Sequence, residues 1–148
     1  MPEEGGGADS PPPVTQPETV LAIDFGLRRM GLAVGQSITG TASPIDSIAA
    51  NDGVPGWAEL DRLVADWRPD FLVVGLPINM DGSESEMSGR VRRFAKVLEK
   101  RYSMPVELTD ERLTTREAKH AFPGTDDHPA AARLIAESWL CQRLRKAR

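Results

Sequence analysis

The chain has 148 residues, 40% hydrophobic and 27% charged, which is enough for one globular domain with a substantial core. Its single cysteine, Cys141, excludes an internal disulfide, and no apolar stretch approaches the roughly 20 residues of a membrane-spanning helix. The net charge is −4, but residues 1–19 carry four acids and no base, so the remainder is balanced with 18 acids and 18 bases. This balance excludes a strongly basic nucleic-acid-binding domain, so any such binding would need a local basic face.

Residues 1–18 predict a disordered tail, because they are acidic, rich in glycine and proline, and without hydrophobic periodicity. They lack the basic and apolar regions of a secretory signal, so we expect a cytoplasmic protein. The folded domain is then residues 19–148. It opens with two apolar strands, residues 20–26 and 30–35, whose short connection predicts an antiparallel hairpin.

The rest of the domain alternates between helices and strands. A third strand over residues 41–48 contains Pro44, which predicts an irregular strand or one at the sheet edge. Apolar residues at helical spacing predict an amphipathic helix over residues 56–67. The later elements are a buried strand over residues 71–76, a helix marked by Met87, Val91 and Leu98, a short strand from Val106, a short helix capped by Thr114 or Thr115, and a final helix from Pro129. This order predicts an α/β domain with a mixed sheet.

Asp24 stands inside the first apolar strand, where an unpaired carboxylate is costly unless a cation or several donors meet it. Glu111 follows a later apolar segment, with Asp110 as a rival for the same role. Two acids at strand ends could hold a divalent metal ion. The alternatives are an Asp24 that caps the adjacent turn and a Glu111 that lies in a solvated turn or pairs with Arg112.

A third group of candidates, Asp126, Asp127 and His128, precedes the final helix. Acids at a helix start usually cap the free amides, but they can also bring a further ligand to a metal. Mg²⁺ and Mn²⁺ prefer hard oxygen donors, and two such ions can activate a water and stabilise the leaving oxygen of a phosphodiester.

Basic residues gather in two places. Arg28 and Arg29 lie beside Asp24, where a scissile phosphate would sit. The helix near residues 86–102 carries the larger group, which either forms a solvated face or follows a phosphate backbone. Its members are Arg90, Arg92, Arg93, Lys96, Lys100 and Arg101.

Three segments of the chain resemble the signature blocks of one known family. They are residues 23–34 (IDFGLRRMGLAV), 74–86 (VGLPINMDGSESE) and 109–118 (TDERLTTREA). These blocks are similar to those of the YqgF family of pre-16S rRNA nucleases, also described as Holliday-junction-resolvase-like proteins. The resemblance runs from about Val20 to the C-terminus, and the middle block is its most specific part.

The resemblance implies a ribonuclease H-like fold, in which helices flank both faces of a central mixed five-stranded sheet, and nuclease chemistry with Mg²⁺ or Mn²⁺. Asp24 and Glu111 match the first two acids of the family. At the third position this chain has His128, with Asp127 one place earlier. Arg28 or Arg29 matches a basic position, and Gly75, Pro77 and Asn79 match a loop that shapes the substrate floor.

The expected substrate is RNA, as the 5′ end of pre-16S rRNA in a pre-ribosome, and the alternative is branched DNA of the Holliday-junction type. The expected protein is a monomer or weak homodimer with no membrane partner. A non-catalytic nucleic-acid-binding assembly factor is a second hypothesis, because His128 departs from the family pattern. An actin-like ATPase also uses Asp-x-Gly on a hairpin, but it needs two such halves.

Overall fold

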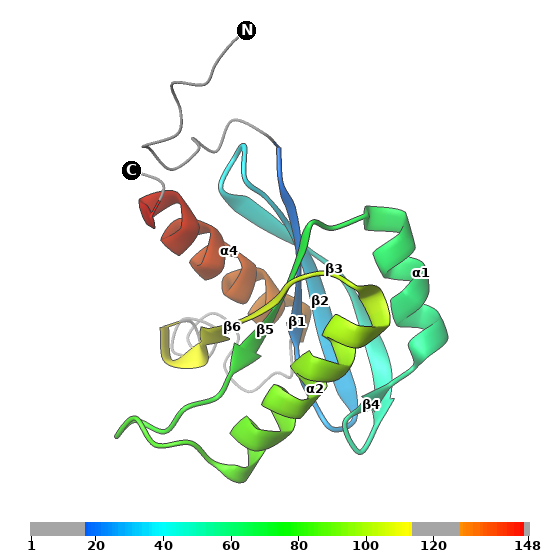
Figure 1. Ribbon diagram of the computed structural model, residues 1–148, viewed down its shortest axis with the longest axis vertical. Coiled ribbons are helices and arrows are strands. Elements are labelled where there is room, and N and C mark those ends of the chain that lie inside the picture. The colour runs from blue at the N-terminus through cyan, green and yellow to red at the C-terminus, as the bar shows by residue number, and fades with distance from the viewer. Residues whose placement is uncertain (1–16, 114–127, 147–148) are drawn as a thin grey trace, which may run out of the picture.

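The computed structural model describes residues 17–113 and 128–146, which form a central sheet with helices on both sides (Figure 1). The strands are β1 (Thr19–Asp24), β2 (Arg29–Gln36), β3 (Thr41–Asn51), β4 (Val54–Pro55), β5 (Phe71–Leu76) and β6 (Val106–Asp110). The helices are α1 (Trp57–Trp67), α2 (Glu86–Tyr102) and α4 (His128–Lys146), and a short 3₁₀ helix, η2 (Glu111–Leu113), follows β6. The short helix predicted after Thr114 or Thr115 lies outside the described residues, as does the tail except for its last two positions.

The six strands follow the order β4-β3-β2-β1-β5-β6. Strands β1 to β4 pair antiparallel with their neighbours in sequence, whereas β1, β5 and β6 run parallel. The predicted mixed sheet with its N-terminal hairpin is therefore confirmed. The prediction of five strands omitted β4, a two-residue strand that is too short to show a hydrophobic period.

Side chains of β1 alternate between two cores, as expected for a strand covered on both faces. Leu21 and Ile23 pack with α1 and α2, while Val20 and Ala22 pack with α4. The buried residues of the helices complete these cores, and they include Leu60, Val64, Val91, Phe94 and Leu98 on one side and Ile135, Ala136, Trp139 and Leu140 on the other. Helices on both faces were predicted and are confirmed.

Strand β3 is irregular at Pro44, as predicted. Ala33 of β2 pairs with Pro44 while Leu32 pairs with Asp46, so Ile45 is an extra residue in the ladder. Strand β4 covers β3 only at Ala50 and Asn51. Most of β3 thus lies at the sheet edge, where a proline costs no ladder hydrogen bond.

Helix α4 approaches the sheet closely at its start. A β-carbon on Gly31 would lie 2.1 Å from the carbonyl carbon of His128, so only glycine fits there. Within residues 17–113 and 128–146, no helix combines the length and apolar character needed to cross a membrane.

Candidate metal centre at the carboxyl ends of β1 and β6

Asp24 is the last residue of β1 and lies on the face of the sheet that α4 covers. Its side chain is only 14% exposed, and its Oδ2 is 2.8 Å from Nδ1 of His128, the first residue of α4. The two residues are 104 positions apart in the chain. The tight passage over Gly31, the register partner of Asp24, brings them together.

Glu111 follows β6, and its side chain extends over the neighbouring strand β5. It passes Gly75, where a β-carbon would lie 2.7 Å from Oε1 of Glu111. Because β1, β5 and β6 are parallel, their carboxyl ends meet at one edge of the sheet. The glycine on the central strand of the three therefore leaves room for Glu111 to reach toward Asp24.

The electrostatics of Glu111 show that the two acids are neighbours. The pKa of Glu111 is raised from 4.5 to about 7, first by burial and then by the negative charge of Asp24, a hydrogen bond with Asp24 and the charge of Asp110. Two adjacent, partly buried carboxyl groups repel each other when both are ionised. A bound cation would relieve this repulsion, so the oxygen donors of Asp24 and Glu111 fit a hard divalent metal ion.

Asp110, the rival candidate, is held by Arg112. Its carboxylate accepts hydrogen bonds from the backbone N–H of Arg112 at 2.8 Å and from Nη2 of the same residue at 2.8 Å. These bonds hold the pKa of Asp110 below its ordinary value. The structure thus gives the two neighbouring acids different surroundings, and Glu111 is the one that meets Asp24.

Asp126 and Asp127, the candidates for a third acid, lie outside the described residues, because the structure resumes at His128. In the part of the chain that is described, no three His, Cys, Asp or Glu side chains are grouped so that they could hold a metal ion. Asp24 and Glu111 are therefore a two-carboxylate core, with His128 bonded to one of them. A role for Asp127 as third ligand stays a prediction.

The predicted phosphate-binding residues have different surroundings. Arg28 is exposed four residues after Asp24, while Arg29 donates to Ser47 on β3 through Nε at 3.0 Å. The side-chain amide of Asn79 donates to Ser83 at 3.0 Å and so braces its own loop. Three further candidates lie on α2, namely Arg90, which pairs with Asp52, and the exposed Arg93 and Lys96.

Sequence reasoning missed the partners of these groups. The pair Asp110–Arg112 is local, the pair Asp52–Arg90 joins the β3–β4 turn to α2, and no hydrophobic period marks either. Gly31 lies directly against the backbone of α4 at His128. The space that Gly75 leaves for Glu111 had no signal in the sequence beyond the glycine itself.

Known proteins with similar sequences belong to one family. A family model described as "RuvX: Holliday junction resolvase" matches residues 18–142. A protein of Glaesserella parasuis serovar 5 (strain SH0165), named "Putative pre-16S rRNA nuclease", is 48% identical over 134 residues, covering 84% of this chain and 97% of the relative. A protein of the same name from Edwardsiella ictaluri (strain 93-146) is 46% identical over 133 residues, covering 84% and 95%.

Among solved structures, the one titled "T. thermophilus RuvC in complex with Holliday junction substrate" is similar over 88% of this chain and 97% of that chain. Its TM-score is 0.56 and its sequence identity is 15%, so the likeness is one of fold. It agrees with the ribonuclease H-like arrangement that the three sequence blocks implied.

Proposed function

The chain belongs to the family of RuvX Holliday junction resolvases, and from this membership and the paired acids at the sheet edge we propose that it is a divalent-metal-dependent nuclease. The observation that carries the proposal is the proximity of Glu111 to Asp24. Residues from β1 and from the end of β6 meet there, 87 positions apart in the sequence, and their two carboxyl groups are partly buried neighbours.

In this proposal Asp24 and Glu111 hold Mg²⁺ or Mn²⁺ through their carboxylate oxygens. When bound, such an ion supplies positive charge that activates a water and stabilises the leaving oxygen of a phosphodiester. His128 is a positioning residue, because its Nδ1 holds one oxygen of Asp24 and so fixes the orientation of the carboxylate. Asp127 stands next to it in sequence and is the proposed third ligand.

The chain's own cations would hold the substrate. Arg28 is exposed two residues after the Asp-x-Gly turn, and a guanidinium there can pair with a phosphate in two parallel hydrogen bonds. Arg93 and Lys96 on α2 would bind the phosphates farther along the strand. Contacts of this kind position a nucleic acid without reading its sequence.

The proposed substrate is RNA, specifically the 5′ end of pre-16S rRNA, because relatives that are nearly half identical in sequence carry the name "Putative pre-16S rRNA nuclease". The family description favours a second candidate, a four-way DNA junction. The same proposal places the protein in the cytoplasm, where it acts as a monomer or weak homodimer.

The test is cleavage by the purified protein of a pre-16S rRNA fragment and of a synthetic four-way junction, each with Mg²⁺ or Mn²⁺. We expect Asp24→Asn and Glu111→Gln to reduce the rate of cleavage by more than about 100-fold. Removing a group that only hydrogen-bonds to a metal ligand already reduces metal affinity or activity about 10–100-fold. Asp66→Asn, an exposed acid on α1, is the matched control and should cleave normally.

The substrate that shows cleavage dependent on Asp24 decides between RNA processing and junction resolution. If neither substrate is cleaved in a manner that depends on Asp24, while both still bind, the chain is a non-catalytic nucleic-acid-binding factor and the nuclease proposal fails.

A further inference from the structure

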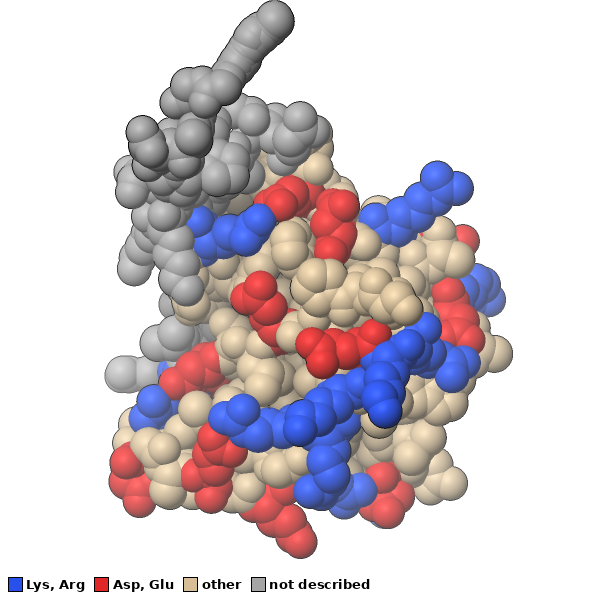
Figure 2. Space-filling model, in the orientation of Figure 1, with Lys and Arg blue, Asp and Glu red and all other residues tan. Residues whose placement is uncertain are grey.

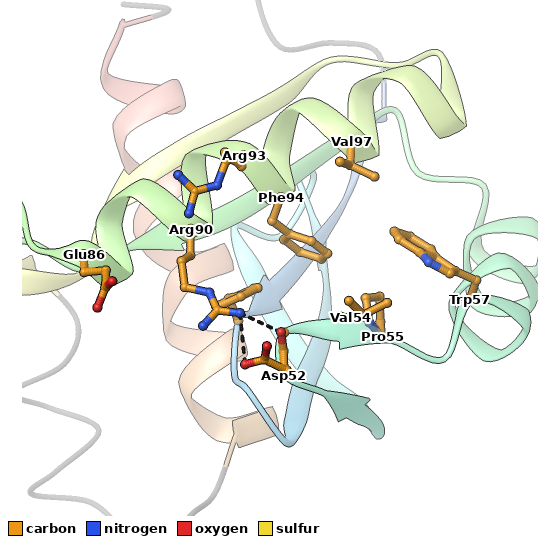
Figure 3. A pocket seen from close by; sticks show the side chains of 11 residues that line it. Asp52, Val54, Pro55, Trp57, Glu86, Arg90, Arg93, Phe94 and Val97 are labelled. Carbon is orange, nitrogen blue, oxygen red and sulfur yellow. Dashed lines mark hydrogen bonds and ion pairs between the residues drawn. The ribbon is translucent and has the colours of Figure 1, made fainter.

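A groove lies between α2 and the turn that joins β3 to β4 (Figure 3). Its volume is about 370 Å³, within the range of small-ligand pockets. Its lining includes three aromatic side chains, with Phe25 against the largely buried Phe94 at a centroid distance of 5.1 Å and Trp57 at the far end. The guanidinium of Arg101 lies 4.5 Å from the centre of the Trp57 ring and holds this ring in place.

The groove is close to the acids but on the other face of the sheet. Phe25 follows Asp24 directly, and neighbouring side chains at a strand end point to opposite faces. Asp24 meets His128 of α4, whereas Phe25 meets Phe94 of α2. A strand of nucleic acid that crosses the carboxyl end of β1 could therefore touch both sites.

Two arginines of α2 line the groove and differ in what they contact. Arg90 donates to the backbone carbonyl of Asp52 at 2.6 Å and to its carboxylate at 3.2 Å, so it fastens the β3–β4 turn to the helix. Arg93 is exposed, and no hydrogen bond or ion pair joins its side chain to any residue in the described ranges. Arg90 thus shapes the groove, and Arg93 is available to an anion at its rim.

The charge beside the groove continues along the helix. Arg93, Lys96 and Lys100 are spaced by three and four residues, so they lie on one side of α2. Figure 2 shows Lys and Arg side chains forming a band along this helix on the face in view. Val97 is 47% exposed between the groove and this band, an apolar surface next to cations.

We propose that this groove binds an unpaired base of a single-stranded RNA segment, while Arg93 and the basic side of α2 bind the adjacent phosphates. Aromatic walls with flanking cations are the usual platform for single strands, because every base offers a face for stacking. Unpaired RNA exposes such bases, whereas a duplex keeps them stacked. The inference rests on the proposed nuclease function and deepens it by naming the form of the substrate beside the cleavage site.

The experiment measures binding of an oligoribonucleotide of about eight nucleotides in the cleavage-deficient Asp24→Asn background. Arg93→Ala should weaken binding about tenfold, the effect of one charge-assisted contact, and should reduce the slope of log affinity against log salt by about 0.7. Arg62→Ala removes the same charge from an exposed site on α1 outside the groove and should change neither quantity.

Two further measurements test the apolar wall. Val97→Asp places a negative charge at the rim and should weaken binding, while the neutral Val97→Thr should not. RNA should also quench the fluorescence of Trp57, so the quench should be lost in Trp57→Phe. Unchanged affinity in both Arg93→Ala and Val97→Asp, with no quench that depends on Trp57, would overturn the proposal. Equal affinity for DNA of the same sequence would overturn the assignment to RNA.

Comparing cleavage by the wild-type protein with cleavage by Asp24→Asn separates this inference from the proposed function. If cleavage depends on Asp24 but RNA leaves the groove untouched, the groove proposal fails alone. If RNA occupies the groove but cleavage does not depend on Asp24, the nuclease proposal fails and the groove stands as a binding site.

Discussion

Gly31 lies against the backbone of His128, so that a β-carbon at position 31 would come within 2.1 Å of the His128 carbonyl carbon and 2.4 Å of the nitrogen of Pro129. These are backbone atoms and cannot rotate away. Gly31 also pairs with Asp24 across β1 and β2. The glycine therefore sets the distance between the start of α4 and the first acid of the site.

Gly31→Ala should displace the start of α4. We expect a loss of stability of about 1–3 kcal/mol, typical of overpacking, together with a marked loss of nuclease activity. The matched control is Gly89→Ala on α2, where the nearest atom to the new β-carbon is Nη1 of Arg93 at 3.6 Å, an ordinary contact. That change should raise helix stability by about 0.5–1 kcal/mol, as measured by chemical denaturation. An active, stable Gly31→Ala protein would contradict the role given to the glycine.

The strands and helices could be predicted because their hydrophobic periods are strong. Strand β5 was predicted with its observed bounds, since it is apolar throughout, and the start of α4 was placed within one residue by Pro129. The contacts that build the site had no such signal. That Glu111 crosses β5 above Gly75, and that Phe25 turns away from Asp24 toward Phe94, depends on the order of strands in the sheet. The motif blocks pointed to Glu111 as the second acid, and the fold adds the physical reason, since Glu111 meets Asp24 whereas Asp110 is held by Arg112.

Gly75→Ala should disturb the metal site more than the fold. Its new β-carbon would lie 2.7 Å from Oε1 of Glu111 and 2.7 Å from Cδ1 of Ile135, and both are ends of flexible side chains. We expect the Glu111 carboxylate to shift and the affinity for Mn²⁺ to fall about 10–100-fold, as when the support of a metal ligand is lost. Isothermal titration calorimetry measures this affinity. Stability should fall by no more than about 3 kcal/mol. Wild-type affinity in a folded Gly75→Ala protein would show that Glu111 does not depend on this space.

The raised pKa of Glu111 makes the metal-free protein less stable as the pH rises. The native state holds the proton up to about pH 7, whereas the unfolded chain releases it near pH 4.5. Between these values the unfolded state binds fewer protons, so the free energy of unfolding falls with increasing pH, by up to about 3 kcal/mol from this group. The stabilising contribution is complete below about pH 4.5 and lost above about pH 7.

Glu111→Gln should remove this contribution. Thermal unfolding in EDTA between pH 5 and pH 8 measures it as the difference between wild-type and Glu111→Gln curves. Asp66→Asn is the control, because it removes an exposed acid of α1 that lies outside the site. Parallel curves for wild type and Glu111→Gln would mean that Glu111 is not buried beside Asp24.

His128→Asp tests the imidazole at the position where the resemblance implies a third acid. The new side chain would place a third acid beside Asp24 and Glu111, and Mg²⁺ prefers such oxygen donors to nitrogen. We expect the rate with Mg²⁺ to rise about tenfold relative to the rate with Mn²⁺.

In EDTA the His128→Asp variant should be less stable than wild type, because a third negative charge joins two others. Saturating Mg²⁺ should restore its stability by mass action, so the metal-dependent shift in Tm should exceed that of wild type. His128→Ala separates the two effects, since it removes the bond to Asp24 without adding a charge. An unchanged metal preference in His128→Asp, with a normal fold by circular dichroism, would place the third ligand elsewhere, and Asp127→Asn would then be the variant that abolishes metal binding.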